Sequence, residues 1–306
     1  MSSAHSLNAM PSAKPRATKA VPRQSPGPMR LIYAREMARL AVRSLHEELC
    51  LYPKPGLVSL VDTGSHDDMD AVTFMRSLFS LRHYFRKIYL AGWDGAPFAQ
   101  LKQLGIAAEA AMLKATRGIN THRGAIFSLG MLCATAGRAR AQGTPMTPAA
   151  LRAAMLIRWG EELARHAAPA VAPLSNGLRV AARYAVSGAR EEGALGLPSV
   201  FEVGVPALLA SRSRGASMTH ARIDTLFALM AHVSDSNVYH RAGPQGAQIV
   251  RAHAQRFIDL GGTSNAYWRD EALASHQVFV AQRLSPGGAA DLLAASCLVH
   301  AIATLT

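Results

Sequence analysis

Apolar side chains recur at three- and four-residue steps from residue 30 onward, which is the period of an α-helix. The first run presents one apolar face, made of Leu31, Ala34, Ala38, Ala41, Leu45 and Leu49. Further helical patterns lie near residues 67–90, 97–116, 123–141, 147–167, 178–193, 198–212, 219–234, 246–260, 267–283 and 287–304. The alternation typical of strands is nearly absent, and residues 86–93 are the only weak candidate. The pattern predicts an all-α fold.

No repeat and no interdomain linker interrupts this pattern. The chain has 306 residues, of which 49% are apolar, so it is long enough to bury the core of a large domain. We expect a single multi-helix globular domain over residues 30–306, with about ten helices. Residues 1–29 are basic and acid-poor and are expected to form a disordered tail.

Composition narrows the class of protein further. The longest apolar stretches, such as 124–137, are too short to span a bilayer, so no transmembrane helix is expected. The cysteines Cys50, Cys133 and Cys297 are far apart in apolar helical contexts, which favours buried free thiols over disulfides or zinc ligands. Free thiols and the lack of a signal peptide suit a cytoplasmic protein.

The formal net charge of +13 suits an anionic partner. Nucleic acid is the less favoured one, because aromatic residues are only 6% and the basic residues outside the tail are scattered. Charge alone also suits a membrane surface or polyphosphate substrates, and we expect no membrane partner.

The segment KPGLVSLVDTGSHDDMD at residues 54–70 gathers polar side chains behind a Pro-Gly turn. Ser65 as N-cap and Asp68 at the third helical position fit a capping box, which is a purely structural explanation. Capping does not explain Lys54, Gly56, Asp62 or His66. Just upstream, Glu48 lies at the edge of the apolar face of its helix, where a carboxylate needs a partner or a ligand.

A second segment, ATRGINTHRGAIFSLG at 115–130, places cations at a helix start. Gly118 closes one helix, and Asn120 or Thr121 can cap the next. His122 and Arg123 then occupy the first turn, where a positive charge opposes the helix dipole. A bound phosphate would reverse that penalty, so we favour an anion site over a solvated loop arginine.

Two later segments carry further candidates. In LMAHVSDSNVYHRAG at 229–243, Asp235 and Asn237 offer the oxygen ligands that Mg²⁺ takes, and Arg241 follows; an Asx turn is the alternative. In RLSPGGAADLLAASCLVHAIATL at 283–305, Ser285 can cap a helix whose first turn holds Gly287 and Gly288, which suit close approach of a ligand or backbone.

The helix after Gly288 is apolar nearly all round, so it should be buried. Asp291 inside it then needs a partner, either an arginine of the fold or a group of the site. In SNGLRVAARYAVSGAREEG at 175–193, Arg190 lies in a charged helix end, for which simple solvent exposure is the favoured explanation.

Together these segments resemble one family, the ATP:dephospho-CoA triphosphoribosyltransferases. The resemblance covers about residues 48–295 and rests on five motifs in order: PKPGLVS with GSHDDM, AEAAMLKATRGINTHRGAIFSLG, GAREEG with GLPSV, DSNVYHRAG, and SPGGAADLLA. The form with Asp62 and Ser65 looks closer to the malonate decarboxylase branch than to the citrate lyase branch. In GAREEG, Glu192 and Gly193 depart from the family pattern, which lowers the weight of Glu191 and Glu192.

The resemblance implies an all-α enzyme that moves the 5-triphosphoribosyl group of ATP to the 2′-hydroxyl of 3′-dephospho-CoA and releases adenine. The product would be the precursor of a prosthetic group, handed to a holo-acyl carrier protein synthase that acts on a decarboxylase or lyase carrier subunit. Such a reaction must bind the triphosphate without cleaving it. Mg²⁺ and basic side chains are suited to binding phosphate groups in this way. It must also stabilise an oxocarbenium-like centre and move protons.

These demands assign a role to each candidate residue. Glu48 or His66 is the general base, and His122 aids the departure of adenine or binds phosphate. The metal candidates are Asp68, Asp235 and Asn237, of which Asp68 and Asp235 also count as catalytic. The candidates for holding phosphate or substrate are Lys54, Asn120, Arg123, Arg190, Arg241, Ser285, Gly287 and Gly288.

Two other functions fit parts of the sequence. A magnesium-dependent hydrolase of a nucleotide or an ADP-ribose-like substrate would use the same acids with water as acceptor. A non-enzymatic nucleic-acid-binding module with a cationic arm would use the basic tail. The histidine and aspartate segments argue against the second of these.

Overall fold

The computed structural model describes residues 27–168 and 189–305, and these residues form helices and connections without a strand. The all-α prediction is therefore confirmed. The elements are α1 (Pro28–Leu49), α2 (Ala71–Ser80), α3 (Arg82–Trp93), α4 (Phe98–Ala115), α5 (Arg123–Gln142), α6 (Pro148–Ala167), α8 (Ala189–Ala194), the π-helical η1 (Ser199–Gly204), α9 (Val205–Ser213), α10 (Met218–His232), α11 (Ser236–Asp259), the 3₁₀ turn η2 (Gly262–Ser264), α12 (Trp268–Ala281) and α13 (Gly287–Ala303).

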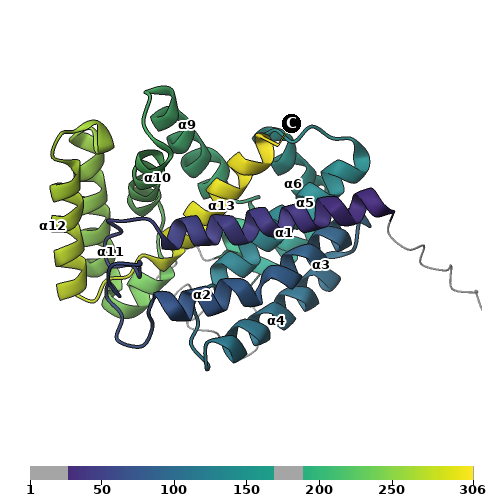
Figure 1. The fold of residues 1–306 in the computed structure, drawn as a ribbon, viewed down its shortest axis with the longest axis horizontal. Coiled ribbons are helices and arrows are strands. Elements are labelled where there is room, and N and C mark those ends of the chain that lie inside the picture. Colours follow the sequence, from purple (N-terminus) through teal and green to yellow (C-terminus); the bar gives the residue numbers. More distant parts are fainter. Residues whose placement is uncertain (1–26, 169–188, 306) are drawn as a thin grey trace, which may run out of the picture.

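α5 and α13 form the centre of the molecule, since nearly every face of each helix is buried. Figure 1 shows α1 crossing in front of α13, with α2, α3 and α4 on one side of α1 and α11 and α12 at one end of the molecule. α3 meets α5 backbone to backbone: a Cβ at Gly92 would lie 1.9 Å from the carbonyl oxygen of Ala134. Only glycine permits that approach. The expected burial of the last helix is confirmed.

The predicted helix near 67–90 is in fact two helices. α2 begins at Ala71, because Asp70 is its N-cap and accepts a hydrogen bond of 2.8 Å from the backbone N–H of Thr73. The capping box on Ser65 is therefore wrong. Leu81 separates α2 from α3, and residues 86–93, the weak strand candidate, lie inside α3.

Other boundaries also shift. The first helix starts at Pro28, since proline is well suited to the first helical position. The helix predicted over 246–260 starts already at Ser236, and Gly243, with φ of 64°, breaks it ahead of Pro244. Most of the predicted tail, residues 1–26, lies outside the described residues, and so does most of the helix predicted over 178–193, of which α8 is the described end.

The cysteine prediction is correct for two of three residues. Cys133 and Cys297 are buried and free, but Cys50 is exposed. Cys50 is the C-cap of α1, where the chain turns and the apolar face of the helix no longer determines which side chain is buried. None of the described helices is long and apolar enough to cross a membrane.

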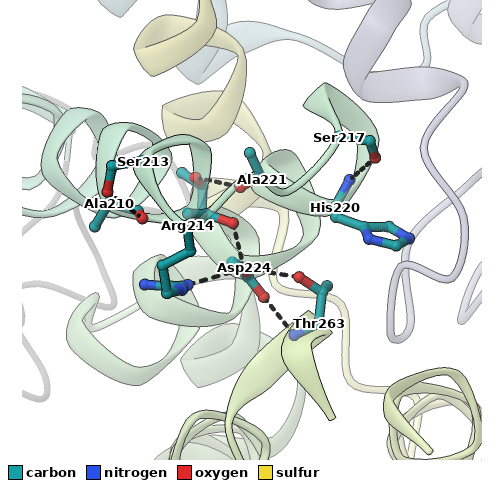
Figure 2. Close-up of polar contacts among 10 residues, drawn as sticks. Ala210, Ser213, Arg214, Ser217, His220, Ala221, Asp224 and Thr263 are labelled. Carbon is teal, nitrogen blue, oxygen red and sulfur yellow. Dashed lines mark hydrogen bonds and ion pairs between the residues drawn. The ribbon is translucent and has the colours of Figure 1, made fainter. Parts of the chain in front are cut away.

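Asp224 on α10 ties three segments together, as Figure 2 shows. Its carboxylate accepts hydrogen bonds from the hydroxyl of Ser211 on α9 at 2.5 Å and from the backbone N–H of Thr263 at 2.8 Å. The Thr263 hydroxyl donates a further bond at 2.9 Å, and Arg214 lies at 3.4 Å. The only carboxylate in this cluster therefore fixes η2 and the end of α9 onto α10.

We predict that Asp224→Ala lowers the free energy of unfolding by about 1–3 kcal/mol, because it leaves the buried Ser211 hydroxyl and the Thr263 N–H without an acceptor. Urea denaturation followed by circular dichroism measures the change. The control is Asp259→Ala on the exposed end of α11, where Asp259 bonds only Gln255. Equal stability of the two variants would show that the cluster contributes nothing.

Candidate active site

The connection between α1 and α2 covers residues 50–70; residues 51–59 are mostly buried, and Ser65 is buried in the more exposed remainder, where it contacts the segment before α13. The Ser65 hydroxyl lies 2.6 Å from the carbonyl oxygen of Leu284 and 3.1 Å from that of Phe279. Gly56 has φ of 69°, and a Cβ there would lie 2.1 Å from the Leu284 oxygen. Ser65 thus fastens two distant motifs to each other instead of capping a helix, and Gly56 permits the contact.

Glu48 at the end of α1 forms a buried ion pair with Lys54. Oε1 of Glu48 lies 2.6 Å from Nζ of Lys54, and the two residues are 4% and 1% exposed. The predicted need of Glu48 for a partner is confirmed. Burying such a pair costs several kcal/mol of desolvation for each ion, which its attraction only offsets in good geometry. A cost of this kind is often retained where chemistry needs the charges.

His122, the residue before α5, is buried beside this pair. Its Nδ1 lies 2.6 Å from the hydroxyl of Ser77 on α2, while its Nε2 is buried without a hydrogen-bond partner. Burial lowers the pKa of His122 to about 3, and the positive charge of Lys54 adds to the effect. The imidazole is therefore neutral at pH 7, with one nitrogen left for a ligand.

The N-termini of α11 and α13 meet at Asp235. Its Oδ1 accepts the N–H of Asn237 at 2.9 Å, and its Oδ2 accepts the N–H of Ala289 at 3.0 Å. Burial raises the pKa of Asp235, and these backbone hydrogen bonds oppose the rise. A Cβ at Gly288 would lie 2.9 Å from Oδ2, and one at Gly287 would lie 3.0 Å from the side-chain nitrogen of Asn237. The groups that approach these two glycines are thus side chains of the protein.

Asp291, five residues into α13, faces the N-terminus of α5. Its Oδ2 occupies the space beside Gly124, where a Cβ would lie only 2.2 Å away, and it accepts a hydrogen bond from the N–H of Ala125. Burial raises the pKa of Asp291 well above its ordinary value, and the charges of Glu48 and Asp235 raise it further. The expected partner of Asp291 is thus a helix N-terminus rather than an arginine.

His66 lies between the two motifs that Ser65 joins. Its Nε2 is 2.8 Å from the Ser285 hydroxyl, and Arg241 donates to its Nδ1 at 3.0 Å. Burial and then the charge of Arg241 lower the pKa of His66, while Asp68, with Oδ1 3.6 Å from Nδ1, opposes the shift. Arg241 also donates to the Ser65 carbonyl oxygen at 3.1 Å. His66, Asp68, Arg241 and Ser285 therefore form one contiguous group, and their roles in a site stay predictions.

The remaining candidates lie in other surroundings. The Arg123 guanidinium binds Glu109 of α4, and the side chain of Asn120 accepts the backbone N–H of Arg123 at 3.3 Å, as a cap would. Arg190 lies near His166 and lowers its pKa, second to burial. Within the described part of the chain, none of these three bonds the group around His66. Their phosphate-binding roles stay predictions.

A family model for the ATP:dephospho-CoA triphosphoribosyl transferases matches residues 34–306. The chain belongs to this family. It is therefore a transferase, and the family suggested by the five motifs is confirmed.

Relatives from several bacteria carry the same name, probable 2-(5''-triphosphoribosyl)-3'-dephosphocoenzyme-A synthase. The protein of Acinetobacter calcoaceticus is 38% identical over 85% of this chain and 89% of its own length. That of Stutzerimonas stutzeri strain A1501 is 41% identical over 86% and 90%. That of Vibrio cholerae strain M66-2 is 37% identical over 89% of each chain. No solved structure matches this chain.

The carboxylates of the site bear on whether it could bind the expected Mg²⁺. Among the described residues, no three histidine, cysteine, aspartate or glutamate side chains are placed to hold a metal ion together. Mg²⁺ commonly needs only one or two carboxylates when substrate phosphates supply its other ligands. Asp235 uses both oxygens on backbone N–H groups, whereas Asp68 is 64% exposed beside His66. Asp68 and the exposed Asn237 thus keep oxygens accessible for a metal ion that arrives with a polyphosphate, and metal binding by either residue stays a prediction.

We predict that Lys54→Met lowers the free energy of unfolding by about 3–5 kcal/mol, because it leaves the Glu48 carboxylate buried and unpaired. The double variant Glu48→Gln/Lys54→Met should regain most of this loss and remain inactive. Chemical denaturation measures both. Arg256→Met, which removes an exposed partner of Glu271, serves as control and should change stability little. A double variant no more stable than Lys54→Met would contradict the ion-pair assignment.

His122 should make stability depend on pH. Its folded pKa of about 3 lies below the ordinary value of 6.5, so between these values the unfolded chain binds more protons. The contribution is complete above about pH 6.5 and is lost as the pH falls towards about pH 3. From about pH 7.5 to about pH 5, the native protein should therefore lose about 2 kcal/mol more than His122→Asn.

Urea denaturation at the two pH values measures this difference. His122→Asn keeps a polar atom near the Ser77 hydroxyl, so the variant isolates the titration. The exposed His83 on α3 provides the control variant His83→Asn, which should follow the native protein. A pH dependence of His122→Asn equal to that of the native protein would mean that His122 does not titrate in this way.

Proposed function

We propose that this chain transfers the 5-triphosphoribosyl group of ATP to the 2′-hydroxyl of 3′-dephospho-CoA, releasing adenine and forming 2′-(5″-triphosphoribosyl)-3′-dephospho-CoA. The observation that carries the proposal is the buried Glu48–Lys54 pair beside the unpartnered Nε2 of His122. Family membership supplies the reaction, and these groups supply charges and a free ligand position that a core without chemistry would not retain.

The basic groups are suited to a triphosphate that is held but not cleaved. Arg241 lies within hydrogen-bonding distance of His66, at the rim of the group, and Lys54 lies at its buried end. Ser285, Gly287 and Gly288, where α13 begins, are proposed as substrate contacts beside the Ala289 N–H, which Asp235 accepts. Mg²⁺ neutralises phosphate charge when bound, and Asp68 with Asn237 would hold it. Asn120, Arg123 and Arg190 are proposed as further phosphate contacts.

The proton on the attacking 2′-hydroxyl needs an acceptor, for which the geometry offers Glu48 and His66. Glu48 is the carboxylate of the ion pair. His66 is neutral at pH 7, because burial and Arg241 lower its pKa, and its imidazole can accept a proton at Nδ1 once the hydrogen bond from Arg241 is released. The negative charge of Glu48 also opposes the positive charge that develops at C1′ of the ribose.

We further propose that the product serves a malonate decarboxylase, through a holo-acyl carrier protein synthase that attaches the prosthetic group to the carrier subunit. The support is the sequence around Asp62 and Ser65. Both residues anchor the connection after α1: Asp62 accepts the N–H of Gly64 at 2.9 Å and lies 3.6 Å from His276, and Ser65 binds Leu284.

The reaction predicts equal amounts of adenine and of the triphosphoribosyl adduct from ATP, Mg²⁺ and 3′-dephospho-CoA. Mass spectrometry of the mixture measures both products. In the same assay, Asp68→Asn should lose activity, whereas Asp67→Asn should not, since the more exposed Asp67 pairs with Arg283. Adenine without adduct would point instead to a hydrolase with water as acceptor. Folded protein that releases no adenine would contradict both activities.

A further inference from the structure

The ring of His122 is held in one orientation by groups from two neighbouring helices. Its Nδ1 lies 2.6 Å from the hydroxyl of Ser77 on α2, and the ring of Phe74, also on α2, meets it edge to face with the centroids 5.0 Å apart. The backbone N–H of His122 donates to Sδ of Met112 on α4 at 3.3 Å. Ser77 and His122 are 0% and 2% exposed. The ring therefore cannot exchange the places of Nδ1 and Nε2 without breaking its bond to Ser77.

The hydroxyl of Thr121 decides the direction of the hydrogen bond between Ser77 and His122. Thr121, in the connection between α4 and α5, donates to the Ser77 hydroxyl oxygen at 2.7 Å. A serine hydroxyl has a single hydrogen, which it can donate while its oxygen accepts. The hydrogen of Ser77 is thus left for Nδ1 of His122, which accepts it. A neutral imidazole whose Nδ1 accepts carries its own hydrogen on Nε2.

The hydrogen on Nε2 meets no acceptor within the described part of the chain. Nε2 is buried and has no hydrogen-bond partner there. Lys54, the cation whose charge acts on His122, is itself a donor and cannot satisfy this group. A buried donor without an acceptor costs free energy, so such groups are rare in native proteins. The open donor therefore indicates an acceptor that is present only when a substrate is bound.

We infer that Ser77 and Thr121 are positioning residues for the transfer, because their hydroxyls fix His122 as the tautomer with hydrogen on Nε2 and so make it a hydrogen-bond donor to ATP. The inference rests on the proposed function. The Nε2–H is suited to the lone pairs of a phosphate oxygen or of an adenine ring nitrogen. It is not suited to accept the proton of the 2′-hydroxyl, which stays with Glu48 or His66. His122 neither gains nor loses a proton in this role.

Two-bond ¹H–¹⁵N NMR spectra of protein labelled with ¹⁵N-histidine measure the tautomer in the enzyme without substrate. The chain has 12 histidines, so the His122 signals are assigned by their loss in His122→Asn. At neutral pH we expect a neutral ring with hydrogen on Nε2, since burial lowers the pKa of His122 to about 3. Hydrogen on Nδ1, or an even mixture of the two forms, would overturn the inference.

ATP tests the donor role in the same spectra. Saturating ATP, added without 3′-dephospho-CoA, should move the Nε2 signal of His122. Inorganic triphosphate, which lacks the base, should move it in the same way only if the acceptor is a phosphate oxygen. A signal that ATP leaves unchanged would refute the donor role.

Two variants remove the directing hydroxyls one at a time. Ser77→Ala takes the donor away from Nδ1, and Thr121→Val, at a half-buried position, keeps the shape of threonine but not its bond to Ser77. Both should let hydrogen appear on Nδ1 in part of the molecules. The control is Ser80→Ala on the same helix, where the lost hydroxyl bonds only the backbone oxygen of Ser77. The native tautomer in Thr121→Val would overturn the role of Thr121 even if Ser77→Ala did not fold.

Kinetics separate positioning from simple support of the core. In the transfer assay, kcat of both directing variants should fall about 3–10-fold, the usual effect of one neutral hydrogen bond, and the loss should follow the fraction of molecules without hydrogen on Nε2. A hydroxyl that only stabilised the core would lower the unfolding temperature without linking kcat to the tautomer. An unchanged kcat in a variant with an altered tautomer would therefore refute the inference.

The same experiments distinguish this inference from the proposed function. A native enzyme that forms no adduct from ATP contradicts the proposed function and the positioning role with it. A native enzyme that forms the adduct but carries hydrogen on Nδ1 of His122 refutes only the role of Ser77 and Thr121. Ser80→Ala should match the native enzyme in both kcat and tautomer.

Discussion

A carboxylate taken out of water must be compensated, and the centre of this fold is arranged around three of them. A single uncompensated buried ion costs several kcal/mol, a large part of the stability of a domain. The protein compensates Glu48 with a lysine and Asp235 with two helix N-termini, whereas Asp291 has one N–H and a pKa that burial and the neighbouring carboxylates raise. These contacts connect α1, α5, α11 and α13, because each helix contributes a carboxylate or the N–H that receives it.

The same arrangement links stability to chemistry. Acyl and glycosyl transfer need one group that accepts a proton and another that donates one at the same pH. Two carboxyl groups do this only when their surroundings differ, as they do for Glu48 beside Lys54 and for Asp291 beside like charges. Placing both in a shared interior also couples them: after burial, the charge on Glu48 is the next cause that raises the pKa of Asp291. A solvated pair on the surface would lack this coupling.

Much of this could be predicted from the sequence, for identifiable reasons. The helical period and the all-round apolar character of 287–304 are local properties, so the fold class and the burial of α13 were predictable. Burial of the edge position of Glu48 required a partner, and the structure provides Lys54, only six residues away. Burial likewise required a partner for Asp291. That partner, the Ala125 N–H, lies at the start of a helix distant in the sequence, which no local pattern specifies.

What could not be predicted depends on contacts across the fold. Ser65 satisfies every local rule for an N-cap, but its hydroxyl binds Leu284, 219 residues later, and Asp70 caps α2 instead. The local preference of Ser65 for an N-cap does not decide its role here. A buried carbonyl oxygen without a donor costs more free energy than an exposed helix start without a particular cap.

Gly287 and Gly288 are a second case in which the sequence predicts a close contact but not the group that makes it. Two glycines at a helix start indicate close approach, but the sequence cannot say of what. The structure shows that Asp235 and Asn237 approach them, so that the carboxylate of Asp235 can reach the first N–H groups of α13. With the Asp235 charge already satisfied by the protein, the triphosphate does not compete for the same N–H groups. The anion site must therefore be completed by side chains that remain accessible, of which Arg241 is the one that the structure places beside His66. A site built in this way holds phosphate at its rim and keeps its interior for the atoms that react.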